Sequence, residues 1–168
     1  TGHTEIVNAL LQANANPNLV DKNGNSPLLM ASQNGHTDIV NALLKACADP
    51  NLVSKYGNSP LLLAAQDGHI DSVNVLLAAG ANPNLVNQNK TSPLLKAAQN
   101  GHTDIVNALL AAGAKINHVD KEGISPLLLA SATGHTEIVN ALLKAKSNPN
   151  LVNNNGNSPL LVAVQSEK

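Results

Sequence analysis

Apolar residues along this chain gather in short clusters that recur at a fixed period, and polar stretches rich in Asn and Gly separate the clusters. In residues 21–53 the first cluster contains Leu28, Leu29 and Ala31. It follows Ser26 and a proline, which are a favoured N-cap and a favoured first helical residue. The pattern predicts a short helix that ends at the next Gly-His pair, because glycine readily adopts the left-handed conformation that closes helices.

A second apolar cluster in the same segment has the spacing of one buried helical stripe. Thr37 is expected to cap this helix, and Asp38 lies where the positive end of the helix dipole stabilises a carboxylate. The stripe consists of Ile39, Val40, Leu43 and Leu44. A polar segment with a turn pair such as Asn-Gly follows. Each period thus predicts a helix, a turn, a second helix and a hairpin loop.

The period is 33 residues: Gly-His recurs at 2, 35, 68, 101 and 134, and Ser-Pro-Leu-Leu begins at 26, 59, 92, 125 and 158. Four complete units result, at 21–53, 54–86, 87–119 and 120–152, with partial units at 1–20 and 153–168. Such short helices are unstable alone, since about 12–15 residues are needed in water. Neighbouring units must supply the core, so the chain is expected to form one quasi-one-dimensional array.

This pattern resembles the ankyrin repeat over the whole chain. The Pro-Leu pair, the Ala-rich first helix, Gly-His, Ile-Val and Leu-Leu occur in the family's order. The family's Thr-Pro-Leu-His appears here as Ser-Pro-Leu-Leu in every unit, so apolar packing is expected to replace hydrogen bonds between adjacent repeats. The resemblance implies an all-α, ankyrin-type repeat solenoid: a right-angled stack of helix-turn-helix units with hairpin loops.

Composition fits many small layers and limits the classes of function. Apolar residues make up 43 % of the chain, yet Phe and Trp are absent and Tyr56 is the sole Tyr. With 10 Lys, no Arg and a net charge of -1, the chain lacks the basic footprint of a nucleic-acid-binding protein. No apolar run reaches the roughly 18 residues of a membrane helix. The lone Cys47 permits no intramolecular disulfide and fits an intracellular, cytoplasmic setting.

Histidine recurs in every unit, which raises the questions of metal binding and catalysis. Equivalent residues in packed units lie about 8–10 Å apart, whereas zinc needs nitrogen ligands about 2 Å from one centre. The His-x-Asp/Glu pattern of His36 and Asp38 recurs without a matching nucleophile, whereas catalytic groups form a single site. We therefore expect no enzyme, no metal site and no cofactor, and these histidines should bond nearby backbone. His118, where other units have Leu, is expected to be a partly exposed loop residue.

The remaining candidates for function lie on the surface. The resemblance implies that a protein partner contacts the hairpin tips and the adjoining face of the first helices, on the concave side. The units differ most at six positions, which form the predicted partner-binding set: Tyr56, Lys90, Thr91, Lys96, Glu122 and Ile124. Lys90 replaces a turn glycine and Lys96 an apolar residue. Sequence drift in a tolerant third unit explains the same differences.

Three interpretations of function follow. The first is a scaffold that binds a protein partner through the concave surface. The second is a structural or spacer array whose near-identical units have no dedicated partner. The third is an engineered or consensus-like scaffold, because design also produces uniform repeats. Diversity at the tips separates the first two interpretations, and here that diversity is low.

Two further expectations concern the loops. Gly80 and Gly113 follow second helices, and at the same place Asn14, Cys47 and Lys146 are expected to be forced into the left-handed conformation. Asparagines at 18, 51, 84, 117 and 150 recur between units, where their amides should satisfy backbone groups. The resemblance also offers these asparagines as substrates for an asparaginyl hydroxylase.

The chain begins with a second helix and ends with a first helix, and polar capping units are absent from it. We therefore expect it to be a piece of a longer array. The two half-units are also complementary: the helix expected at 159–166 of one copy could pair with the helix expected at 4–13 of the next. Such a head-to-tail contact would give end-to-end self-association.

Overall fold

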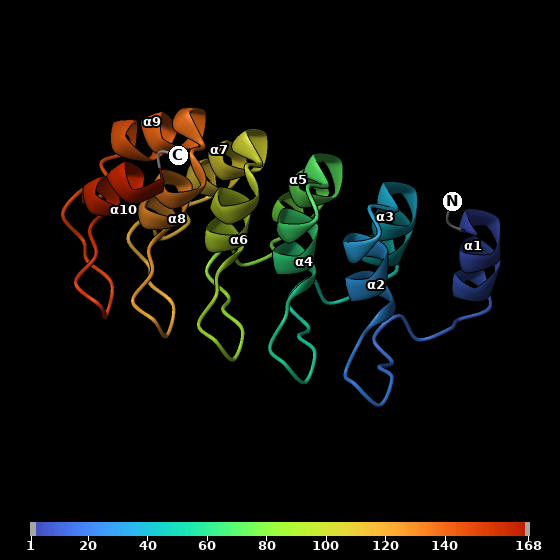
Figure 1. The fold of residues 1–168 in the computed structure, drawn as a ribbon. Helices are drawn as coiled ribbons and strands as arrows, with labels where there is room; N and C mark the ends of the chain where they lie inside the picture. The colour runs from blue at the N-terminus through green and yellow to red at the C-terminus, as the bar shows by residue number, and fades with distance from the viewer. Residues whose placement is uncertain (1–2, 167–168) are drawn as a thin grey trace.

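The computed structural model describes residues 3–166, which form an all-α stack (Figure 1). Ten α-helices and no β-strand occur in these residues. The helices are α1 (Thr4–Gln12), α2 (Pro27–Gln33), α3 (Thr37–Lys45), α4 (Pro60–Gln66), α5 (Ile70–Ala78), α6 (Pro93–Asn100), α7 (Thr103–Ala111), α8 (Pro126–Thr133), α9 (Thr136–Lys144) and α10 (Pro159–Ser166). Hairpin loops project from one side of the stack (Figure 1). The predicted fold class, a solenoid of helix-turn-helix units, is confirmed.

The first helix of a unit begins and ends where the sequence predicts. The Ser26 hydroxyl accepts a hydrogen bond from the Leu29 backbone N–H at 3.1 Å, and Pro27 is the first helical residue. The equivalent serines of the other units make the same bond. Beyond the far end, Gly35 has a φ of 68°, the left-handed conformation in which glycine closes a helix. Local sequence therefore sets the length of this helix.

The expectation that Thr37 caps the second helix is wrong. Helix α3 already includes Thr37, its N-cap is His36, and no side chain caps it. The Thr37 hydroxyl instead lies 3.0 Å from the hydroxyl of Ser72 on α5. A hydrogen bond between units has taken the group that the sequence suggested for a local cap. Asp38 lies in the first turn, as expected.

Packing along the stack buries the apolar stripes. Helices α2, α4, α6, α8 and α10 contact one another in sequence, and α1, α3, α5, α7 and α9 do the same. Leu28, Val40 and Leu43 belong to one buried cluster that runs through the units. Fully buried alanines such as Ala64 and Ala97 let neighbouring first helices approach closely. The core is therefore a series of thin layers, which explains why the chain needs no Phe or Trp.

The leucines that stand where the related repeat pattern has histidine are packed as expected. Leu29, Leu62, Leu95 and Leu128 are buried, whereas the fifth, Leu161 on α10, is 42 % exposed. Leu29 and Leu62 also belong, with Leu63, to a small second cluster. Apolar contact between units thus occupies the position at which the related pattern makes hydrogen bonds.

Histidine side chains tie each unit to the preceding one. Their Nε2 atoms bond backbone carbonyl oxygens, and the pairs are His69 with Gln33, His102 with Gln66 and His135 with Gln99, at 3.0, 3.0 and 3.2 Å. Each acceptor lies 36 residues earlier in the chain. The histidines do bond backbone, as the sequence suggested, but that backbone belongs to another unit.

Each of these rings also covers a glycine of the preceding unit. A Cβ atom added at Gly101 would lie 2.7 Å from Cε1 of His135, which is too close for any side chain. Gly101 also has a φ of 79°. Glycine is required here both for the backbone conformation and for the space under the ring.

Asparagines of the inter-unit loops tie each unit to the following one. The Asn51 amide donates to the Gly80 carbonyl oxygen at 3.2 Å and accepts from the Asn82 N–H at 2.8 Å. Asn18 and Asn84 bridge to the next unit in the same two ways. Asn117 accepts from the Asn148 N–H at 2.9 Å, whereas the Asn150 side chain makes no such bond in the described residues. The expectation that these amides satisfy loop backbone groups is therefore confirmed for four of the five asparagines, and the groups belong to the neighbouring unit.

Three loops that follow second helices hold a non-glycine residue in the left-handed conformation. Asn14, Cys47 and Lys146 have φ values of 62°, 64° and 66°, where Gly80 and Gly113 have 86° and 84°. The expectation from the sequence is therefore confirmed. Such a residue costs about 1–2 kcal/mol, and asparagine is tolerated best.

Cys47→Gly and Lys146→Gly should each raise the free energy of unfolding by about 0.5–1 kcal/mol, because relief of left-handed strain exceeds the extra entropy of glycine in the unfolded chain. Chemical denaturation followed by circular dichroism measures the change. Ala46→Gly is the matched control: Ala46 has a φ of -87°, so glycine there should lower stability. If neither substitution stabilises the protein, the strain argument is wrong.

The glycine under each histidine permits a second matched comparison. Gly101 and Gly134 have φ values of 79° and 76°, but a Cβ added at Gly134 would meet nothing within 4 Å. Gly101→Ala should lower the free energy of unfolding by about 2–3 kcal/mol and Gly134→Ala by about 1 kcal/mol, since only the first also displaces a histidine from its hydrogen bond. Urea unfolding of both variants checks this, and equal losses would mean that the histidine contributes nothing.

Candidate functional site

The hairpin tips form a continuous row, which we call the tip row: residues 22–25, 55–58, 88–91, 121–124 and 154–157. Backbone hydrogen bonds join adjacent tips, from Lys55 N to Asn23 O, Gln88 N to Tyr56 O, Lys121 N to Asn89 O and Asn154 N to Glu122 O, at 2.9, 3.0, 3.2 and 3.0 Å. Figure 1 shows these loops side by side along the stack. The backbone therefore fixes the spacing between side chains of successive tips.

Each tip is also held internally by the residue that precedes it. One carboxylate oxygen of Asp21 accepts hydrogen bonds from the Asn23 and Asn25 backbone N–H groups, at 2.8 and 2.9 Å. The Asn25 N–H is the main cause that lowers the pKa of Asp21 below its ordinary value, and the Lys55 ammonium adds to this effect. Asn87, Asp120 and Asn153 hold their tips in the same way. The tips are preorganised loops.

Five of the six residues of the predicted partner-binding set lie on or in three consecutive tips. Tyr56, Lys90 and Glu122 are exposed, whereas Thr91 and Ile124 are half-buried. The sixth, Lys96, lies half-buried on α6, and its ammonium donates to the Gln99 side-chain oxygen at 3.2 Å. The bonds between tips bring the first five into one neighbourhood, while Lys96 belongs to the adjoining helix.

Two irregular residues of the third unit meet at one hydrogen bond. Lys90 has a φ of 58°, the left-handed conformation that glycine adopts at the same place in the other tips. The His118 Nε2 atom lies 2.6 Å from the Lys90 carbonyl oxygen. His118 is half-buried, as the sequence suggested, but its bond to a tip was not foreseen. This contact holds the backbone that carries the unusual lysine.

A row of exposed valines was missed by the sequence-based selection. Each hairpin follows a valine two residues before its tip, and Val20, Val53, Val86 and Val152 are 48, 38, 37 and 49 % exposed. Val119 in the remaining hairpin is half-buried. The signal was present in the sequence, because an aliphatic residue recurs unchanged at the entrance of five polar loops. These valines place apolar surface beside the polar tip row.

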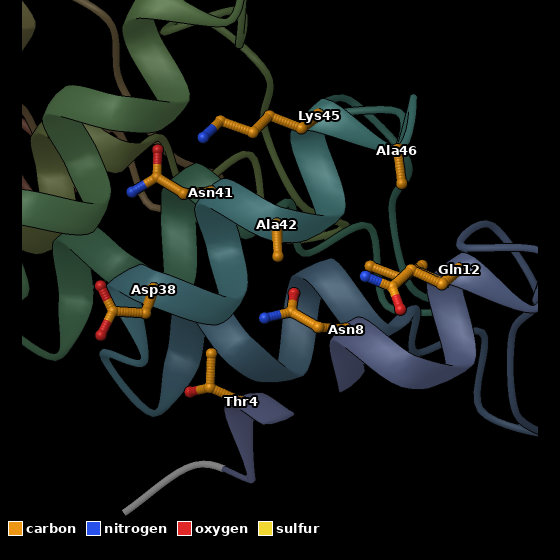
Figure 2. Close-up of a pocket in the computed structure, with 9 residues that line it drawn as sticks. Thr4, Asn8, Gln12, Asp38, Asn41, Ala42, Lys45 and Ala46 are labelled. Carbon is orange, nitrogen blue, oxygen red and sulfur yellow. The ribbon is translucent and has the colours of Figure 1, made fainter. Parts of the chain in front are cut away.

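A groove of about 790 Å³ lies between α1 and α3. Figure 2 shows Thr4, Asn8 and Gln12 of α1 on one side and α3 residues, among them Lys45, on the other. The groove is wide and lined mainly by amide, hydroxyl and alanine side chains. It offers hydrogen bonds but no nucleophile paired with a base, so it carries no catalytic assignment.

Metal-ligand clusters and membrane-spanning helices are two further features that residues 3–166 can be compared with. No group of three or more His, Cys, Asp or Glu side chains in this range could hold a metal ion. None of its helices has the length and apolar character needed to cross a membrane.

Comparison with protein-family models gives a match to the model described as ankyrin repeats (3 copies), over residues 1–87 and 94–168. No curated protein matches the sequence. The matched ranges cover nearly the whole chain, and the order of helices and loops in the structure agrees with the repeat. The chain belongs to the ankyrin repeat family.

Proposed function

We propose that this protein is a scaffold that binds a protein partner through the tip row and the adjoining first helices. Ankyrin repeats are generally protein-interaction modules, and the family is typically non-enzymatic. The proposal assigns the partner surface to the predicted set of Tyr56, Lys90, Thr91, Lys96, Glu122 and Ile124.

The rigidity of the tip row is the observation that carries the proposal. Backbone bonds between tips and side-chain bonds within them fix the loops, while side chains such as Tyr56 and Lys90 remain exposed. A preorganised surface binds better than a mobile one, because less conformational entropy is lost on association. The helices, in contrast, use their apolar faces for packing between units.

Within the tip row, the middle tips differ most from the rest. Tyr56 is an exposed aromatic residue, of the type that dominates binding energy in interfaces. Lys90 keeps a strained backbone conformation, and strain of this kind gathers at functional positions. Together these features favour a partner centred on the second, third and fourth tips.

A spacer array is the second candidate, and the uniformity of the units favours it. Most tips carry Asn or Lys, and the bonds between units repeat with little variation. A spacer would need rigidity but no particular tip side chain. The two candidates therefore differ in whether substitutions at the middle tips change an interaction.

Replacing Tyr56, Lys96 and Ile124 together by Ala should weaken partner binding about tenfold or more, because loss of one hot spot costs about 2 kcal/mol and 1.4 kcal/mol is tenfold. Affinity capture from a native extract, followed by titration of the captured protein, measures the effect. The matched control replaces Asn23, Met30 and Asn25, the equivalent residues of the first unit. Circular dichroism checks that both variants fold, and equal binding by both would favour the spacer.

We also propose that copies of this 168-residue polypeptide associate head to tail. Ile6 and Leu10 of α1 are 57 and 55 % exposed, whereas the equivalent Ile39 and Leu43 of α3 are 8 and 3 % exposed. On α10, Leu160 and Val164 are likewise exposed. The α1 helix of a second copy would cover α10 as α9 covers α8, because α1 and α9 have nearly the same sequence.

Sedimentation of the polypeptide should show oligomers that grow with concentration, and Leu160→Asp should abolish them without unfolding the chain. Val86→Asp is the control, since Val86 is 37 % exposed on a hairpin in the middle of the stack, away from α1 and α10. A monomer that persists at millimolar concentration would rule this association out.

A further inference from the structure

The lysines of the tips form a row of their own. Lys22, Lys55, Lys90 and Lys121 lie on four consecutive tips, and all four are exposed. Glu122 is the one carboxylate within the tip row as defined above. Asp21 and Asp120 flank it, but their oxygens accept the hydrogen bonds of the turns. These two carboxylates remain ionised, so the hairpins hold four lysines against three carboxylates. The hairpins therefore keep a small excess of positive charge, although the whole chain has a net charge of -1.

The largest group of carboxylates lies at the other end of the helix pairs. The second helices each have one acidic residue in the first turn: Glu5, Asp38, Asp71, Asp104 and Glu137. The first helix of each unit leads from the hairpin to the far side of the stack, and the second helix begins there. These carboxylates are therefore remote from the tips. Five of the 11 carboxylates in the sequence thus lie on the second helices, away from the four tip lysines.

The third unit maintains the lysine row in an unusual way. The other units have glycine where Lys90 stands, and Lys90 accepts a left-handed backbone there. His118 replaces a leucine and donates to the Lys90 carbonyl oxygen at 2.6 Å. Two departures from the repeat, 28 residues apart, therefore meet at one contact. The His118 contact thus holds the backbone of the third tip in the conformation that carries this lysine.

Aliphatic surface accompanies the lysines. The valines that precede the tips, such as Val53 and Val86, are exposed along the same hairpins. Adjacent units are about 8–10 Å apart when their helices pack. A peptide in the extended polyproline II conformation advances about 3.1 Å per residue with three residues per turn. Every third side chain therefore points the same way, and about three residues span one unit. A peptide with one carboxylate and one aliphatic side chain in every three residues would match the row.

We propose that the tip row binds an extended acidic peptide segment whose carboxylates meet Lys22, Lys55, Lys90 and Lys121 and whose aliphatic side chains meet the neighbouring valines. The assignment rests on the proposed scaffold function and specifies the chemistry of its partner. A protein segment fits better than a nucleic acid, because the chain has no Arg and only one aromatic residue. Single-stranded nucleic acids are bound by aromatic stacking platforms that the tips lack.

The probe is a fluorescein-labelled peptide of Glu-Val-Ser triplets, titrated with the full chain and followed by anisotropy. We expect saturable binding that weakens several-fold between about 50 and about 300 mM salt, since exposed charges are screened over shorter distances at higher salt. Replacing both Lys55 and Lys121 by Ala should weaken binding roughly tenfold, as exposed pairs contribute modestly. The control replaces Lys45 and Lys144, which lie at the ends of α3 and α9, with the same loss of charge and no expected effect.

Lys90→Gly gives a readout that a purely structural role would not produce. Glycine should relieve the left-handed strain, so the unfolding midpoint should rise, while affinity for the Glu-Val-Ser peptide should fall several-fold. A more stable variant with unchanged or tighter binding would overturn the role of Lys90. Glu-Val-Ser residues rearranged to place the carboxylates in one block should bind more weakly, because the match to the units is lost.

Other probes decide between this proposal and its competitors. Equal or tighter binding of a Lys-Val-Ser peptide, or of a labelled oligothymidylate, would overturn the acidic-peptide assignment, as would absence of binding at millimolar peptide. A random peptide library panned on the chain separates the two levels of inference. If the library yields non-acidic peptides that no longer bind the Tyr56, Lys96 and Ile124 variant, the scaffold function stands and the acidic partner is refuted. If the selected peptides bind that variant as well as the unchanged chain, both proposals are refuted.

Discussion

The inability of any single unit to bury its own apolar residues is the constraint on which the structure depends. Helices of seven to nine residues are too short to persist in water alone, so every unit needs neighbours. The same need explains the composition. Thin layers of Leu, Ala, Val and Ile fill the space between units, and large aromatic side chains would force the layers apart. Burial and hydrogen bonding between units then act together, since the histidine and asparagine contacts form only when units stack.

Local features of the fold were predictable because their causes are local. Ser26 caps the helix that begins at the next residue, through the N–H of Leu29, and Gly35 closes the same helix through its own φ angle. The acceptor of His69 and the partner of Thr37 lie more than 30 residues distant, and no spacing rule within one unit identifies them. The sequence suggested that Thr37 caps its own helix, because nothing within one unit shows that its hydroxyl bonds Ser72 of the next unit. Repetition of a motif shows that a residue serves the stack, but the structure is needed to say which unit it serves.

The candidate surface was predictable only in part. Departures from the repeat drew attention to Tyr56 and Lys90, since variation stands out against uniform units. The valine row was missed for the opposite reason. The same valine recurs in every unit, as core residues do, and only its exposure to solvent distinguishes it from a buried position. The contact between Lys90 and His118 joins two hairpins, and sequence could not have placed these residues together. A search for residues that vary between units finds Tyr56 and Lys90 but overlooks the valines, which are the same in every unit. The chemistry of the surface is therefore better judged from the shared and the variable residues together.

The bonds between units have a consequence for how the protein can change over generations. A histidine reaches back to the preceding unit and an asparagine reaches forward to the next, as His102 and Asn51 do, so one unit carries both halves of the chemistry for a new junction. Duplication or loss of a 33-residue segment therefore recreates a working junction without any compensating substitution. The length of such an array can therefore change in steps of one unit without loss of the contacts that join its units.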